Sequence, residues 1–181
     1  VTHGHGDHVG DTVALTKGFL GVSVVAQVEL KSWLHEQGAV LDEVPGLNKG
    51  GSRDIDGIRF TLVNAFHSSS ADDGAYTGES CGLVFRLEEV RTVYFAGDTC
   101  VFGDMALIQD LYHPNIILLN VGGGPYTEDP KAAAMAIRPM FSIDEYASIR
   151  LTSLVTVSIS AATSSVASPI TSSPVRRNPG P

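Results

Sequence analysis

The sequence predicts a layered α/β domain. Segments typical of strands and helices alternate along the chain: a β-branched run (22–27) precedes an amphipathic pattern (28–37), and an apolar run (115–121) precedes an alanine-rich one. Two further apolar runs, CGLVFRL and TVYFAGD, are joined by a short polar stretch, as in an antiparallel hairpin. This alternation with one hairpin favours helices packed on a sheet over an all-α or all-β fold.

The first half of the chain should contain two helices and two strands. We predict a short helix over residues 11–17, which begins at a capping aspartate and ends before a glycine. A buried strand is predicted over 22–27 because the run is β-branched. A helix should follow over 28–37, where two leucines and the tryptophan share a face. The polar, glycine-rich residues 46–54 are predicted to be a loop before a strand over 58–67.

The second half continues the alternation. Residues 68–80 form a loop by composition, and the two runs of the hairpin follow. A short helix over 104–111 then precedes a buried strand over 115–121. Asp129 is the expected N-cap of an alanine-rich helix, because Pro130 suits the first helical position.

The composition changes after Arg138. Serine and threonine crowd the end of the chain, and no acidic residue follows Glu145. We therefore divide the chain into a domain, residues 1–137, and a tail, residues 138–181. The tail is either a genuine Ser/Thr-rich segment or the product of a shifted reading frame.

Charge and composition narrow the class of partner. The chain has 181 residues, enough for one domain, and a formal net charge of −8, which disfavours nucleic acid or an anionic membrane as the main partner. No run approaches the roughly 18 apolar residues of a membrane helix. Cys81 and Cys100 lack CxxC spacing, so we interpret them as reduced thiols and expect a cytoplasmic protein.

The first residues, VTHGHGDHVGD, have the composition of a metal site. On an extended segment, residues two apart project to the same side, so His3 and His5 can face one ion. Asp7 and His8 lie where the chain bends toward the next helix, and they can face a second ion. Because zinc generally takes four ligands, further ligands should come from strand ends, where His67 and Asp98 lie.

This pattern resembles the metallo-β-lactamase superfamily. THGHGDH, a later strand-end histidine and the GDT of Asp98 carry the resemblance. The segments VYFAGDT, NIILLNVGGG and DPKAAAMA resemble its metal-dependent hydrolase branch, close to sugar-phosphate lactonases. The resemblance covers residues 1–137. It implies an αββα sandwich in which His3, His5 and His67 bind one metal.

The resemblance also implies that Asp7 and His8 bind a second metal and that Asp98 bridges the two. It departs from this sequence at both ends. The first strands of the family fold should precede Val1, and a further histidine ligand should follow the alanine-rich helix. No histidine follows His113, so we expect a weakened second site. Because the missing ligand falls where the composition changes, we favour a shifted frame as the origin of the tail.

The chemistry expected of such a site is hydrolysis. Two cations can hold a bridging hydroxide that attacks a small ester, lactone or phosphoester, with catalytic roles for Asp7 and Asp98. The imidazole and carboxylate donors favour zinc, with manganese or iron as alternatives. A small-molecule substrate is expected, and the oligomeric state stays open. The alternative is a catalytically impaired fragment that keeps a partial metal site.

Overall fold

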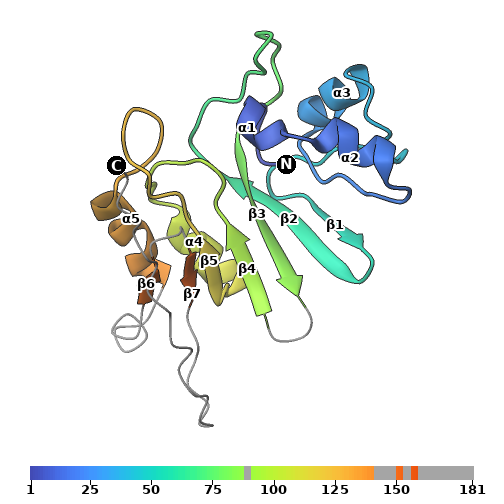
Figure 1. Ribbon diagram of the computed structural model, residues 1–181. Coiled ribbons are helices and arrows are strands. Elements are labelled where there is room, and N and C mark those ends of the chain that lie inside the picture. The colour runs from blue at the N-terminus through green and yellow to red at the C-terminus, as the bar shows by residue number, and fades with distance from the viewer. Residues whose placement is uncertain (88–90, 141–149, 153–155, 159–181) are drawn as a thin grey trace, which may run out of the picture.

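The computed structural model describes residues 1–87, 91–140, 150–152 and 156–158 and shows a mixed α/β architecture (Figure 1). Within the described part, one sheet has the strand order β1-β2-β3-β4-β5-β7-β6. β4 and β5 pair in parallel, and the other neighbouring strands pair antiparallel. The predicted α/β class is confirmed.

The strands are β1 (Ser52–Ile55), β2 (Ile58–Asn64), β3 (Cys81–Leu87), β4 (Arg91–Phe95), β5 (Ile116–Leu118), β6 (Arg150–Thr152) and β7 (Thr156–Ser158). The helices are α1 (Gly6–Val9), α2 (Thr12–Gly18), α3 (Val28–Glu36), α4 (Met105–Tyr112) and α5 (Pro130–Ile137), and α5 runs into a 3₁₀ turn, η1 (Arg138–Met140). β6 and β7 lie within the predicted tail, and the division after residue 137 stays a prediction.

The predicted loop before residue 58 was wrong in part, because its end forms β1. Asp56 and Gly57 connect β1 to β2, with φ values of 50° and 82°. Two left-handed residues in a two-residue loop match the natural twist of a hairpin. The Asp-Gly pair was the sequence signal for this hairpin, and the pairing with β2 outweighs the low strand propensity of the polar residues in β1.

The predicted strand over residues 22–27 was also wrong. The segment is extended, and Val24 and Ala26 are buried. Its backbone makes one isolated bridge, between Gln27 and Leu47. The Leu47 N–H donates to the Ala26 carbonyl at 2.9 Å. The β-branched run therefore packs into the core but finds no neighbouring segment, in the described part of the chain, with which to build a ladder.

The predicted helices are confirmed, and their ends show why they form. In α3, Leu30 and Leu34 are fully buried, and the helix ends at Glu36, two residues before Gly38, whose φ is 88°. In α5 the Asp129 carboxylate accepts a hydrogen bond from the Ala132 N–H at 2.8 Å. α2 begins where predicted, but the side chain of its N-cap residue makes no capping bond.

Helices pack on one face of the sheet and leave the other face to a smaller cluster. α4, α5 and η1 cover a core that includes Tyr94 and Ile117. The opposite face holds Leu62, Cys81 and Leu83, with Phe85 and Phe95 packed against them. α1, α2 and α3 gather beside the β1–β3 part of the sheet, while α4 and α5 lie by β4 and β5 (Figure 1).

One edge of the sheet gathers the segments that carry the predicted ligands. β2 and β4 run in the same direction, and β3 runs between them in the opposite direction. The chain therefore leaves β2 and β4 at the edge where β3 begins. The N-terminal segment is fixed there, because the Cys81 N–H donates to the Thr2 carbonyl at 3.0 Å. No helix within the described residues is long and apolar enough to cross a membrane.

Candidate metal centre

The N-terminal histidine loop depends on its glycines. A Cβ on Gly4 would lie 2.8 Å from the carbonyl oxygen of Ser69, and it would also clash with the Thr77 hydroxyl. The chain can therefore lie against the 69–77 loop only without a side chain at residue 4. After His5 the backbone turns into α1, and the His8 N–H donates to the His5 carbonyl at 2.9 Å.

Thr2 holds two of the histidines. Its hydroxyl oxygen lies 3.1 Å from Nδ1 of His3 and 3.1 Å from Nδ1 of His8. Both Nδ1–H groups can donate to this oxygen, which assigns the tautomer that leaves Nε2 of each ring with a free lone pair. Such outer hydrogen bonds commonly orient metal-ligating histidines.

His67 and Asp98 each lie three residues beyond a strand, after β2 and β4 respectively. The Phe66 N–H donates to the Thr99 hydroxyl at 3.0 Å, which ties the two segments together. Gly97 has a φ of 66°, and a Cβ there would lie 2.9 Å from the Cys81 carbonyl oxygen. The turn that directs Asp98 toward the histidines is therefore specific to glycine.

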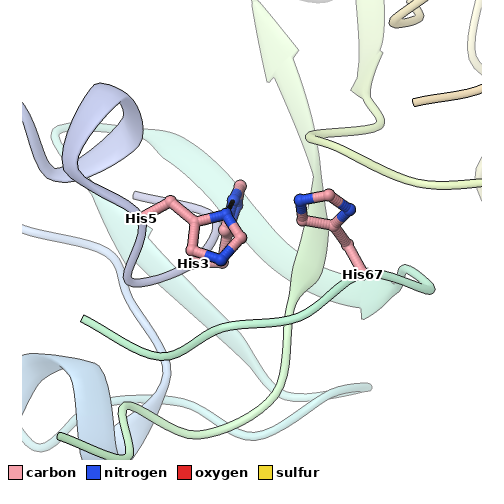
Figure 2. A group of neighbouring side chains, drawn as sticks. All are labelled: His3, His5 and His67. Atoms are coloured by element: carbon pink, nitrogen blue, oxygen red, sulfur yellow. Dashed lines mark hydrogen bonds between the residues drawn. The ribbon is translucent and has the colours of Figure 1, made fainter. Parts of the chain in front are cut away.

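The structure brings five of the six predicted ligands into two overlapping groups. The ligand atoms of His3, His5 and His67 lie within 4.8 Å of one another, and so do those of His3, His8 and Asp98. Figure 2 shows the rings of His3 and His5 from the N-terminal loop facing that of His67 from a different segment. The His5 and His67 ring centroids are 5.0 Å apart.

Asp7 lies outside both groups. Its side chain is 80% exposed, and its Oδ2 is 3.6 Å from Nε2 of His8. It still lines the cavity described below. Its role as a ligand and as a catalytic group stays a prediction.

The donors fit a divalent ion such as zinc. Tetrahedral bonds of about 2.0–2.1 Å to nitrogen or oxygen place neighbouring ligand atoms about 3.4 Å apart. Nε2 of His3 lies 3.0 Å from Nδ1 of His5, and Oδ2 of Asp98 lies 3.4 Å from Nε2 of His8. The other nitrogen of His5, Nε2, is 3.1 Å from the Ser68 hydroxyl, so each of these rings keeps one nitrogen for a ligand bond.

Burial keeps the central imidazoles neutral, which is the state that binds metal. Desolvation, together with the neighbouring histidines, lowers the pKa of His3 from 6.5 to about 3. Desolvation also lowers the pKa of His67, while the negative charge of Asp98 opposes this shift. The ring nitrogens of both residues are therefore available at neutral pH.

The cluster opens onto a cavity of about 840 Å³. Its walls include the histidine loop, the segment after β2, and the residues that follow β4 and β5. The lining residues are His5, Asp7, His8, His67, Ser68, Phe95, Gly97, Asp98, Leu118, Asn120, Val121, Gly122, Gly123, Tyr126 and Thr127. Space for a small molecule therefore adjoins the candidate ligands.

The comparison with known families agrees with this geometry. Residues 1–162 match the model of a family described as the beta-lactamase superfamily domain. The chain belongs to this superfamily. The predicted membership of the metallo-β-lactamase superfamily is therefore confirmed.

Relatives within the superfamily have names that refer to metal-dependent hydrolysis. A UPF0173 metal-dependent hydrolase of Roseiflexus sp. (strain RS-1) is 41% identical over 152 residues, which are 81% of this chain and 62% of the relative. One from Herpetosiphon aurantiacus is 40% identical over 152 residues, with the same 81% and 62% coverage. The chain thus spans about three-fifths of the length of these curated relatives.

A solved structure also resembles the chain. Igni18, a novel metallo hydrolase from the archaeon Ignicoccus hospitalis, superimposes with a TM-score of 0.65 and 31% identity, covering 77% of this chain and 57% of the other. The likeness supports the arrangement of strands and helices around the histidine loop.

Sequence reasoning missed the hydroxyl residues that support the site. Thr2, Ser68 and Thr99 hold His3, His5 and the segment of His67, respectively. A threonine before the first histidine and a serine after His67 were the available signals, but only the fold shows which ring each hydroxyl meets.

Proposed function

We propose that this protein is a metal-dependent hydrolase that acts on a small ester, lactone or phosphoester. It binds two divalent cations, zinc in preference to manganese or iron. His3, His5 and His67 hold the first ion, and Asp7 and His8 hold the second. The names of its relatives and the hydroxyl-supported histidines support this proposal.

The position of Asp98 carries the proposal of two ions. Its Oδ2 lies 3.4 Å from Nε2 of His8 and 3.6 Å from Nε2 of His67. One carboxylate oxygen thus faces one histidine from each proposed ligand set. A carboxylate that faces both ligand sets would suit two neighbouring cations better than one, and its negative charge would offset part of theirs.

When bound, a pair of cations lowers the pKa of water and stabilises negative charge that develops on the substrate. The residues of the chain prepare the site for this chemistry. Thr2 and Ser68 fix the histidine rings, and the buried His3 stays neutral. The exposed Asp7 lies at the cavity, where its carboxylate can accept a proton from the reacting water and release it to solvent.

One observation favours a second candidate, an impaired protein that keeps a partial site. The superfamily resemblance calls for another histidine after α5, and no histidine follows His113 in the sequence. We therefore expect about one tightly held zinc ion per chain and a second, weaker one.

The cysteines and the net charge support the proposed location and partner. Two free cysteines lie among the described residues, which supports a cytoplasmic location. The net charge of the chain supports a small-molecule partner.

The test measures zinc content by mass spectrometry after dialysis, together with hydrolysis of chromogenic esters, lactones and phosphodiesters. Asp98→Asn should lower both the zinc content and the hydrolysis. Asp104→Asn is the matched control, because Asp104 is exposed and makes no capping bond, and it should change neither. Two tightly held ions without hydrolysis would contradict the proposed activity, and no bound zinc would contradict the site itself.

A further inference from the structure

The wall of the cavity after β5 is a loop without charged side chains. Residues 120–127 read NVGGGPYT. Within this loop Asn120, Val121, Gly122, Gly123, Tyr126 and Thr127 line the cavity. The Tyr126 side chain is largely exposed at its rim. This wall therefore offers apolar carbon, an aromatic ring and neutral hydrogen-bonding groups to whatever lies beside the ligand cluster.

The loop is held in place rather than free to rearrange. The Gly123 N–H donates to the Glu128 carbonyl at 2.9 Å, and the Thr127 hydroxyl donates to the Gly123 carbonyl at 3.3 Å. Gly123 and Gly124 have φ values of 64° and 70°, which glycine adopts without strain. Such cross-links fix the neutral groups as a preformed surface.

The described lining of the cavity contains no lysine and no arginine. Apart from Tyr126, its ionisable residues are histidines and aspartates of the ligand cluster. The nearest acidic residues along the loop are Glu128 and Asp129, and the Cβ of Asp129 lies 3.6 Å from where a Cβ on Gly123 would be. A negatively charged group placed against this wall would lose water, and no lysine or arginine of the described lining would neutralise its charge.

We infer that the part of the substrate that lies beyond the scissile bond is uncharged. The inference rests on the proposed hydrolase function and narrows it to neutral esters or lactones with an apolar acyl substituent. A phosphorylated sugar lactone, which carries a distal dianion, is disfavoured. The specificity-determining residue is Tyr126, because it lines the cavity with a largely exposed aromatic side chain, whereas Val121 also packs against the buried core.

The test compares two esters of the same leaving group. 4-Nitrophenyl butyrate has a neutral acyl chain, and the 4-nitrophenyl monoester of succinic acid ends in a carboxylate. For the zinc-loaded chain, we expect kcat/KM to be at least about tenfold higher for butyrate. Tyr126→Lys should narrow this ratio by supplying a cation at an exposed position of the cavity wall. Val101→Lys, at an exposed valine outside the cavity lining, should leave the ratio unchanged.

Equal or faster hydrolysis of the succinate ester by the unsubstituted chain would overturn the inference while leaving the hydrolase function intact. If neither ester reacts, hydrolysis of acyl esters by this chain is ruled out, and calorimetry with the corresponding 4-nitroanilides decides the inference separately. Tighter binding of the butyryl anilide supports an uncharged-substrate site. Equal binding of both anilides, tighter binding of the succinyl anilide, or no binding of either, overturns it.

Discussion

Glu128 places a carboxyl group in the core, and this position should make the stability of the chain depend on pH. The residue is 5% exposed, and neither carboxylate oxygen has a hydrogen-bond partner among the described residues. Burial, together with the charge of Asp129, raises the pKa of Glu128 from 4.5 to about 7. The folded state therefore keeps a proton that the unfolded state has already released between these two values.

The sign and the size of the effect follow from this difference. Below the pKa of the unfolded state, Glu128 is protonated in both states, and its ionisation does not change the free energy of unfolding. As the pH rises toward the pKa of the folded state, ionisation of Glu128 in the unfolded chain lowers the free energy of unfolding. Above the folded-state pKa this loss is constant at about 3 kcal/mol, since each pKa unit corresponds to about 1.4 kcal/mol. Glu128→Gln removes the ionisation, so it should stabilise the chain at alkaline pH and have little effect in acid.

Urea unfolding of the metal-free chain at about pH 5 and about pH 8 measures this effect. The advantage of Glu128→Gln over the unsubstituted chain should grow by about 2–3 kcal/mol between these conditions. Glu43→Gln is the matched control, because Glu43 is exposed, and it should show no such growth. A constant difference between Glu128→Gln and the unsubstituted chain would refute the reasoning.

Three further substitutions test the packing around the site and the core. Gly4→Ala pushes the histidine loop away from the Ser69 carbonyl, 2.8 Å from the new Cβ, and zinc affinity should fall by about tenfold or more in a competition titration. Asp42→Ala leaves the buried Lys31 ammonium without its carboxylate partner, 2.5 Å away, and should cost about 3 kcal/mol in urea unfolding. Asp129→Ala removes the N-cap bond of α5 and should cost about 1 kcal/mol in the same assay. An unchanged unfolding midpoint or zinc affinity would contradict the corresponding contact.

Local patterns were sufficient where neighbours in sequence decide the structure. α3 and α5 follow from apolar spacing and from the Asp-Pro start of α5, and both appear near the predicted bounds. The strand prediction for residues 22–27 was wrong because a strand also needs a neighbouring strand with which to pair. The only described backbone bridge of this segment is to Leu47. β1 was missed because its residues are polar, although the Asp-Gly turn that precedes β2 was visible.

In the candidate site, too, the sequence predicts what consecutive residues determine and not what tertiary packing determines. The spacing of His3 and His5 predicts their shared direction, because it depends on a few consecutive residues. The approach of His67 and Asp98 depends on β2 and β4 running in the same direction. Their positions at strand ends made both residues candidates, and the superfamily resemblance assigned each of them to a metal. The exposure of Asp7 depends on how α1 packs, and no sequence pattern reports that.

The order in which the chain supplies its ligands has a consequence for how it acquires metal. His8 and Asp98 are roughly 90 positions apart, and the N-terminal segment meets the sheet through the contact of Thr2 with Cys81, a non-local contact of the kind that forms slowly. A nascent chain exposes its first histidines long before the last carboxylate has been synthesised. Tight metal binding should therefore follow formation of the sheet, so the rate of metal uptake would report the rate of folding.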